Sequence, residues 1–226
     1  LQEGNVTVSQ VTGTALIVNG NAAFNTHIAN EDNNNVGGGV ELLSENNEFN
    51  SDLIFTSTGT VKLRNSTAVN LGASNINGAF ELTSGGNITQ SGSLSVKDTT
   101  TITATNFDVF LNNEQNKFNT VNFINPIKSL DLLSREGDLT VGDISTSRAN
   151  ENGGNIKITN TASEGLLTVG GLTANGGTAN NDTQGKNGGE ITLKADGSIT
   201  VGNIDTRGSA GNDNSNNKDP EYNGGQ

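Results

Sequence analysis

The chain has 226 residues, of which 31% are hydrophobic and 16% charged, with 30 Gly, 37 Asn, 2 Pro and no Cys, Met or Trp. The absence of cysteine excludes a disulfide framework and thiol catalysis. The net charge of −12 argues against nucleic acid and anionic membranes as partners. No apolar run approaches the ~20 residues that span a bilayer, so membrane insertion is not expected.

Three motifs upstream of residue 130 share a Phe-Asn-Ser/Thr frame and begin at Phe24, Phe49 and Phe118. The last two follow Asn-rich turns at 45–48 and 111–117. Aromatic rings at equivalent positions of successive repeats can stack, and the adjacent Asn can bond a turn or an amide of the next repeat. We therefore predict that these Phe residues are structural and buried, and not a platform for a ligand.

Apolar and polar residues alternate in several segments, including 59–63 and 94–102. This period of two is typical of a β-strand with one buried face. The abundance of Thr, Val, Ile, Asn and Gly suits strands joined by tight turns. With so few hydrophobic residues, the pattern predicts a thin, elongated all-β solenoid, and strict alternation at repeat spacing argues against disorder.

The last third of the chain repeats one motif three times, as GDLTVGDI at 137–144, GLLTVGGL at 165–172 and GSITVGNI at 197–204. The starts of successive copies are separated by 165 − 137 = 28 and 197 − 165 = 32 positions. A unit this short cannot bury an apolar face alone, so it packs against the unit before it and the unit after it. The spacing therefore predicts stacked repeats.

Glycine pairs at 153–154, 188–189 and 224–225 open the alternating segments, and their second members are separated by 189 − 154 = 35 and 225 − 189 = 36 positions. The third copy stops at Gln226, which predicts that another strand follows. No cap is evident near either end, so we expect neighbouring coils or another chain to cover both ends. The residues predicted to point inward from parallel strands are Ile156, Ile158, Leu167, Val169, Ile191, Leu193, Ile199 and Val201.

Long polar connections at 30–39, 178–189 and 207–225 are where binding usually evolves in a solenoid. In the last of them, three acids could coordinate calcium, which prefers several oxygen ligands: Asp213, Asp219 and Glu221. The known calcium-loop patterns are missing, so solvated loop acids are the alternative. No other cofactor is expected.

No catalytic residues are predicted. His27 is the only histidine, and without Cys it forms no readable metal or nucleophile pair, so we interpret it as a surface side chain. A polysaccharide-cleaving β-helix would need clustered carboxylates. The acids instead show no paired spacing: Glu41, Asp52, Glu81, Asp98, Asp108, Asp131 and Asp138. Arg148 and Arg207 occupy comparable repeat positions, which indicates a role in turns.

Segments 68–96 and 99–104, with the Asn-Asn-x-x-Asn-x-Phe turn that ends at Phe118, resemble the repeats of filamentous haemagglutinin-type large exoproteins. The resemblance runs from about Phe24 to Thr120, and the later segments look like looser repeats of the same proteins. It implies a right-handed parallel β-helix that a Gram-negative bacterium exports through a dedicated outer-membrane partner.

We therefore predict one continuous solenoid, with haemagglutinin-type repeats at 1–130 and further coils with longer Gly/Asn-rich loops at 131–226. At roughly 25 residues per coil, the chain would form about nine coils. The expected function is a structural or adhesive segment of a secreted or cell-surface fibrous protein. Its expected partners are neighbouring coils, other copies in a fibre, and surface glycans or proteins. A carbohydrate-active β-helix enzyme and a passive stalk that presents another domain are the alternatives.

Overall fold

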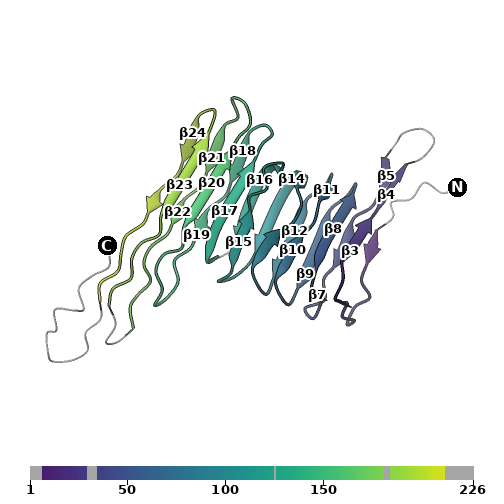
Figure 1. Ribbon diagram of the computed structural model, residues 1–226, viewed down its shortest axis with the longest axis horizontal. Helices are drawn as coiled ribbons and strands as arrows, with labels where there is room; N and C mark the ends of the chain where they lie inside the picture. The colour runs from purple at the N-terminus through teal and green to yellow at the C-terminus, as the bar shows by residue number, and fades with distance from the viewer. Residues whose placement is uncertain (1–6, 30–34, 125, 181–183, 212–226) are drawn as a thin grey trace.

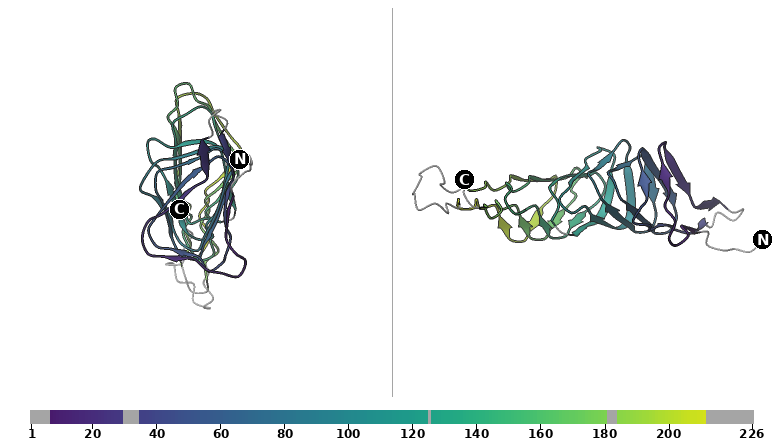
Figure 2. Two further views of the ribbon diagram at one scale, coloured as in Figure 1. Left: turned by 90° about the vertical axis from the view of Figure 1, so that its right-hand side faces the viewer. Right: turned by 90° about the horizontal axis from the view of Figure 1, so that it is seen from below.

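The computed structural model describes residues 7–29, 35–124, 126–180 and 184–211. All regular structure in this part of the chain is β-strand, and the strands lie side by side along one long axis, with β3 near one end and β24 near the other (Figure 1). Seen along that axis the coils superimpose, and seen from the side they form an elongated rod (Figure 2). No helix of the described residues is long and apolar enough to cross a membrane.

Two stacks of parallel strands, each contributed once per coil, form the walls of the rod. Stack 1 contains β3 (Ala22–Asn25), β8 (Asp52–Ser57), β10 (Val69–Leu71), β13 (Ile88–Gln90), β15 (Asp108–Leu111), β17 (Ser129–Ser134), β20 (Ile156–Asn160) and β23 (Ile191–Ala195). Stack 2 contains β1 (Val8–Ser9), β6 (Val40–Leu42), β9 (Val61–Asn65), β12 (Phe80–Ser84), β14 (Leu94–Thr103), β16 (Lys117–Ile124), β18 (Leu139–Val141), β21 (Leu167–Val169) and β24 (Ile199–Val201).

Shorter strands complete the coils. Two small parallel sheets lie where the chain passes from stack 2 to stack 1: β2 (Ile17–Val18) with β7 (Glu48–Phe49), and β19 (Ile144–Ser145) with β22 (Leu172–Thr173) and β25 (Ile204–Asp205). β11 (Ser74–Ile76) joins the end of β8 to the start of β14. One antiparallel hairpin, β4 (His27–Ala29) with β5 (Asn35–Gly37), leaves the stack near its N-terminal end. The predicted parallel β-helix is therefore confirmed.

Stack 2 keeps one register through nine strands. Its inward positions pair in the order Val8, Val40, Val61, Phe80, Thr100, Val121, Val141, Val169 and Val201. Because each strand of the stack belongs to a different coil, the described residues form nine coils, as the length of the chain predicts.

Coil length is uneven around the value of roughly 25 residues that the sequence suggested. The step from Val8 to Val40 is long (40 − 8 = 32), and every step between Val40 and Val141 is shorter, from 19 (80 − 61) to 21 (61 − 40). The last two steps, to Val169 and then to Val201, lengthen again (169 − 141 = 28; 201 − 169 = 32). These last two values equal the spacing of the triplicated motif, so that motif is one coil of the stack.

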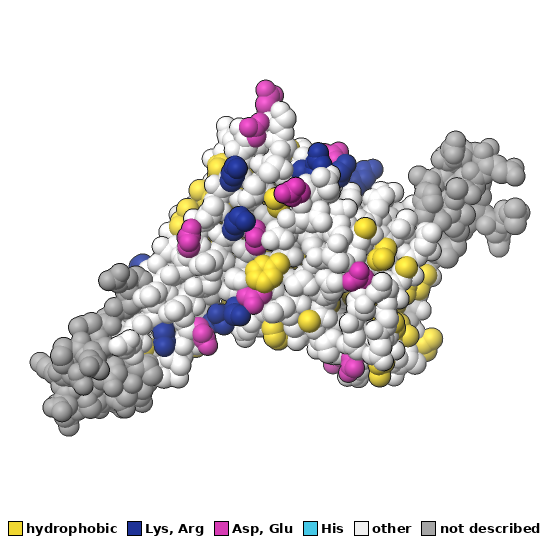
Figure 3. Space-filling model, in the orientation of Figure 1, with side chains coloured by type: hydrophobic (Ala, Val, Ile, Leu, Met, Phe, Trp, Pro, Cys, Tyr) yellow, Lys and Arg dark blue, Asp and Glu magenta, His cyan; other side chains and the backbone are white. Residues whose placement is uncertain are grey.

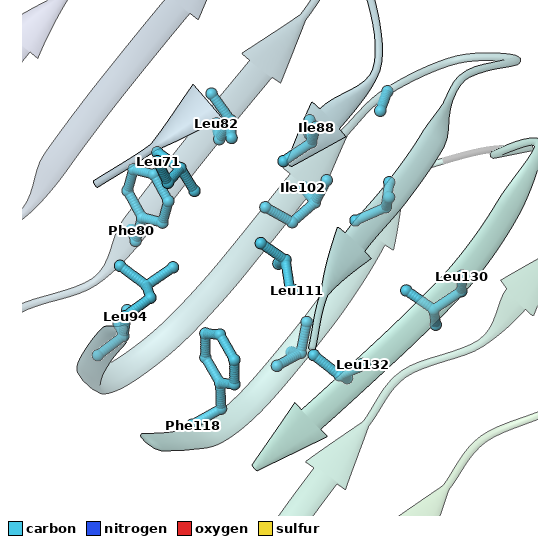
Figure 4. Packing of buried hydrophobic residues seen from close by; sticks show 14 of the residues in the cluster. Leu71, Phe80, Leu82, Ile88, Leu94, Ile102, Leu111, Phe118, Leu130 and Leu132 are labelled. Atoms are coloured by element: carbon cyan, nitrogen blue, oxygen red, sulfur yellow. The ribbon is translucent and has the colours of Figure 1, made fainter. Parts of the chain in front are cut away.

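The core is one continuous cluster of apolar side chains between the two stacks, to which each coil contributes several residues. Leu71, Leu82, Ile102 and Leu132 are at most 1% exposed, and the labelled side chains of successive coils follow one another along the rod (Figure 4). Alternation within each strand produces this core, because every second side chain of a strand points to the same face. β9, for example, alternates buried and half-buried residues along its whole length.

The eight residues predicted to point inward all lie in parallel strands. Ile156, Ile158, Leu167 and Val169 are buried, as predicted. Burial was overestimated for the coil that follows: Ile191, Leu193 and Val201 are only half-buried, and Ile199 is exposed. The difference follows from position, because this coil is the last described one and no described strand covers it.

Two of the three Phe residues predicted to be buried are so, and the third, Phe24, is half-buried against the core. Phe49 and Phe118 are each 2% exposed. Phe24 stacks on Phe55 of the next coil with ring centroids 5.6 Å apart, and it meets Phe49 edge to face at 6.1 Å. The stacking partner Phe55 does not belong to the Phe-Asn-Ser/Thr frame, so the motif identifies the buried rings but not the pairs that they form.

Strand β14 shows where simple alternation fails. Leu94 and Val96 point inward, and so do Thr100 and Ile102, but Lys97 and Asp98 between them are exposed. The register with β16 shifts at this point, between Val96 and Thr99. The segment read as one strand therefore turns a corner of the coil and contributes to two walls.

Candidate functional site

The predicted calcium candidates Asp213, Asp219 and Glu221 lie outside the described residues. Within the described residues, no group of three or more His, Cys, Asp or Glu side chains could hold a metal ion. The backbone of His27 belongs to β4 of the hairpin, and its side chain lies outside the described part.

A pair formed by a buried Asn and a half-buried Gln, which we call the Gln–Asn clamp, fixes each of the two Asn-rich turns. In the first clamp, Gln10 Nε2 donates to Asn47 Oδ1 (2.6 Å), and Asn47 Nδ2 donates back to Gln10 Oε1 (2.9 Å). Asn47 is 0% exposed and also bonds the backbone, donating to the Leu42 carbonyl and accepting from the Leu16 N–H. The clamp thus joins two adjacent coils through side chains whose polar groups are satisfied.

The second clamp repeats these bonds. Gln90 Nε2 donates to Asn116 Oδ1 (2.9 Å), and Asn116 Nδ2 donates to Gln90 Oε1 (2.8 Å). Asn116 is likewise 0% exposed, donates to the Leu111 carbonyl and accepts from the Leu94 N–H. Sequence reasoning found the Asn-rich turns but missed both Gln partners, which lie one coil earlier in the chain.

Side chains of the following coil accept hydrogen bonds from the backbone at the end of the clamped turns. The Phe49 N–H donates to Asn65 Oδ1 (2.8 Å), and the Phe118 N–H donates to Ser134 Oγ (3.0 Å). Asn65 and Ser134 are both buried. Each Phe therefore follows a turn that is hydrogen-bonded to the coil before it, and its own N–H is hydrogen-bonded to the coil after it. Both contacts agree with a structural role.

The long loops near the C-terminal end are stacked, at least over their described residues. The Asn150 N–H donates to the Thr178 carbonyl, and the Gly177 N–H donates to the Glu151 carbonyl, both at 2.9 Å. The Ser209 hydroxyl donates to the Gly177 carbonyl at 2.7 Å. The described residues of these long polar connections therefore extend the coils with backbone hydrogen bonds.

Asp108 is the most enclosed of the scattered acids, with a side chain 12% exposed. It accepts hydrogen bonds from Lys128 Nζ (2.8 Å) and the Ser129 hydroxyl (2.6 Å). Burial alone would raise the pKa of Asp108, but the hydrogen bonds from Lys128 and Ser129 and the positive charges of Lys128 and Arg148 together lower it. Asp108 is therefore a charged structural anchor between coils.

Several other acids are also paired between coils. Asp131 accepts from Lys157 Nζ (3.2 Å) and from Asn112 Nδ2 (2.9 Å). Asp52 accepts from Asn70 Nδ2 and the Ser91 hydroxyl. Acidic and basic side chains are interspersed on the face in Figure 3, so the pairs do not merge there into one charged site. Surface pairs of this kind contribute about 0–1 kcal/mol each.

One open groove, of about 550 Å³, brings two carboxylates together. Its walls include Lys97, Lys117, Glu136 and Asp138, together with Phe118. Glu136 forms an ion pair with Lys117, and Asp138 Oδ1 accepts the Leu166 N–H at 2.9 Å. Glu136 lies only two positions before Asp138 and was not among the acids that the sequence analysis considered, and both carboxylates already have structural partners.

A second groove, of about 510 Å³, follows the outer face of β19, β22 and β25. Asp143 and Asp205 are among its walls, with Phe123. Asp143 Oδ1 accepts the Gly171 N–H (2.7 Å). Hydrogen bonds from the Arg207 guanidinium, and then from Asn175, hold the pKa of Asp205 well below its ordinary value. Arg207 thus pairs within its own turn, as its repeat position indicates.

Comparison with known proteins finds one family. A model described as "Repeats of unknown function (DUF5649)" matches residues 58–125, which are 68 of the 226 residues (125 − 58 + 1). The match falls within the region of the rod where the coils are shortest. No curated protein and no solved structure matches the chain. The chain is therefore a repeat protein with parallel β-structure.

Proposed function

We propose that this chain is a structural segment of a secreted or cell-surface fibrous exoprotein, similar to filamentous haemagglutinins, that extends a rod from the cell. The observation that carries the proposal is the continuous ladder of paired inward positions through the nine strands of stack 2, from Val8 to Val201. At a strand spacing of ~4.8 Å, each further coil lengthens the rod by a fixed increment at constant width.

The polar side chains support a mechanical role. The Gln–Asn clamps, the Asp108 anchor and the stacked loops all join one coil to the next, which resists separation along the axis. The proposal assigns no catalysis to the described residues, because Glu136 and Asp138, which share a groove, are engaged by Lys117 and by the Leu166 N–H. Adhesion to glycans or proteins would use the exposed loops and outer faces.

Localisation tests the proposal most directly. An antibody raised against residues 40–141 is applied to intact and to lysed cells of the source organism, with an antibody against a cytoplasmic protein as the control. We expect labelling of intact cells or recovery from the culture medium. Labelling that requires lysis would contradict the proposal. Small-angle scattering of the purified chain should in parallel give the profile of a rod, and a spherical profile would contradict the mechanism.

A further inference from the structure

One groove runs lengthwise along the outer wall of the rod and crosses four successive coils. It has a volume of about 510 Å³ and follows the outer face of β19, β22 and β25. The residues of its first rank each lie two positions after an inward Val of stack 2: Phe123, Asp143, Gly171 and Asn203. Its second rank consists of register partners: Ser145, Thr173 and Asp205. Three of the four coils are interior ones, so the groove does not depend on an open end of the rod.

Most polar side chains of these walls have no partner among the described residues. The hydroxyl groups of Ser145 and Thr173 and the side-chain amide of Asn203 line the groove without a hydrogen bond to any described residue. Asp143 accepts the Gly171 N–H with Oδ1 at 2.7 Å, which leaves its Oδ2 available. The walls therefore offer two hydroxyl groups, one amide and one carboxylate oxygen to a ligand.

The groove also has an apolar surface and an open centre. Phe123 is half-buried against the core and lines the upstream end of the groove. Gly171 lies between Asp143 and Asn203 in the first rank, and its lack of a side chain leaves the centre open. The face of a hexose ring carries C–H groups and its edge carries hydroxyl groups. An aromatic ring next to amide, carboxylate and hydroxyl groups therefore matches a sugar on both its face and its edge.

We propose that this groove binds a neutral polysaccharide, whose chain lies along the axis of the rod with one sugar over each coil. The inference rests on the proposed function and names the class of partner that the rod holds. Four coils at a strand spacing of ~4.8 Å span ~14 Å, so about three or four sugars fill the groove. A repeating ligand suits a wall that itself repeats, and repeat proteins bind partners along such extended surfaces.

The charge of the walls selects a neutral sugar over an acidic one. The chain carries −12, and Asp143 and Asp205 place two carboxylates beside the groove. The Arg207 guanidinium offsets the charge of Asp205, but a uronate or a sulfated sugar would meet the like charge of Asp143.

The same walls favour binding without cleavage. Both oxygens of Asp205 accept hydrogen bonds from Arg207, at 2.8 Å and 2.7 Å. Asp143 is therefore the one carboxylate of these described walls with an oxygen available to react. Cleavage of a glycosidic bond ordinarily needs two such groups. The bound glycan should remain intact.

Isothermal titration calorimetry of the whole chain tests the proposal, with neutral 1,4-linked oligomers of glucose, of mannose and of N-acetylglucosamine as probes. Gly171→Leu fills the centre of the groove, and its Cβ would meet no listed neighbour closer than 3.5 Å, so the fold accepts it. Thr168→Leu is the matched control, because Thr168 is exposed in β21 of the same coil and does not line the groove. Phe123→Leu removes the ring but keeps an apolar side chain against the core.

At least one neutral hexamer should bind equally to the unmodified chain and to Thr168→Leu, and about tenfold more weakly to Gly171→Leu. Phe123→Leu should also weaken binding. Affinity should rise from the dimer to the tetramer and then change little, because the groove is then filled. Polygalacturonate oligomers should not bind, and the neutral oligomers should be recovered at their original length.

Several results would overturn the inference. They are the absence of binding for all three neutral sugars, equal binding by Gly171→Leu, equal or tighter binding of polygalacturonate, and shortened sugars after incubation. Hydrogen exchange of the coils around β21 shows that the variants fold. A chain that binds none of these sugars, yet labels on intact cells and scatters as a rod, leaves the proposed function intact.

Discussion

Asn116→Ala should loosen the rod locally at the second Gln–Asn clamp. The Asn116 side chain has no exposure to solvent and makes four hydrogen bonds. Two of them satisfy backbone groups, the Leu94 N–H at 2.8 Å and the Leu111 carbonyl at 3.0 Å. The other two hold Gln90, which is only part-buried. Alanine removes all four bonds and leaves the two backbone groups without their side-chain partner.

The magnitude follows from those two groups. A buried donor or acceptor that loses its partner costs about 1–3 kcal/mol of stability, so the loss of partners for both the Leu94 N–H and the Leu111 carbonyl costs about 2–6 kcal/mol. The Gln90 amide adds little, because it can turn toward water. The loss should be local, since each repeat contacts only its neighbours. It is therefore measured by hydrogen exchange at individual amides and not by one global unfolding curve.

The Leu94 amide is the direct reporter, because its hydrogen bond ends on Asn116. Its exchange should accelerate by the factor that about 2–6 kcal/mol implies, while amides of the last coils keep their protection. Asn112→Ala in the same turn is the control: its side chain is exposed and donates to Asp131, so its effect should stay within about 0.5 kcal/mol. Equal exchange at Leu94 in the two variants would refute the clamp as a stabilising element.

Three further changes test the packing of the coils. Phe118→Ala should cost about 3–5 kcal/mol in the coils around it, the usual penalty for emptying a large buried aromatic site, as measured by hydrogen exchange. Gly154→Ala should destabilise the turn before β20, because the added Cβ would overlap the Lys128 carbonyl oxygen, and limited proteolysis should cut there first. The folded pKa of Asp108 is lowered, so its ion pair stabilises the fold above the ordinary pKa of about 4, and the contribution is lost as the pH falls through the folded value. Protection from hydrogen exchange in the coils around Asp108, compared between the unmodified chain and Asp108→Asn at each pH, should therefore converge in acid.

Each of these tests has an outcome that contradicts it. Loss of a binding partner with unchanged exchange around Phe118 would make that ring a binding platform. Unchanged protease resistance in Gly154→Ala would show that the backbone relaxes at no cost. A stability difference between Asp108→Asn and the unmodified chain that persists at low pH would assign the effect to packing and not to charge.

The sequence predicts the repeat geometry well where the motif is regular. Successive copies of the triplicated motif lie in register, since Leu139 pairs with Leu167 and Leu167 pairs with Ile199. The segments after the first two glycine pairs are also in register, because Ile156 pairs with Ile191. These predictions succeed because a period-two pattern fixes the inward face, and because a register slip of one position would expose that whole face.

The sequence does not predict which polar side chains meet between coils. Asn47 and Gln10 are 37 residues apart, whereas Asn116 and Gln90 are 26 residues apart, so the two clamps share no sequence offset. The sequence separation of Gln and Asn in each clamp depends on the length of the loops between the two residues. These loops do not alternate apolar and polar residues, so the sequence pattern does not reveal the separation. The corner at Lys97 is hidden for a related reason: the polar residues that turn the chain look like outward positions of a continuing strand.

Exposure at the ends of the stack is a property of position and not of sequence. GLLTVGGL at 165–172 and GSITVGNI at 197–204 have the same pattern and the same inward face, yet their apolar residues differ sharply in solvent contact. In a linear array each interior coil uses both of its faces on its neighbours, so only a terminal coil keeps a face with which to bind. Recognition along the axis of such a rod is therefore confined to its ends. A partner of a different kind has to bind the outer walls of the rod or its stacked loops.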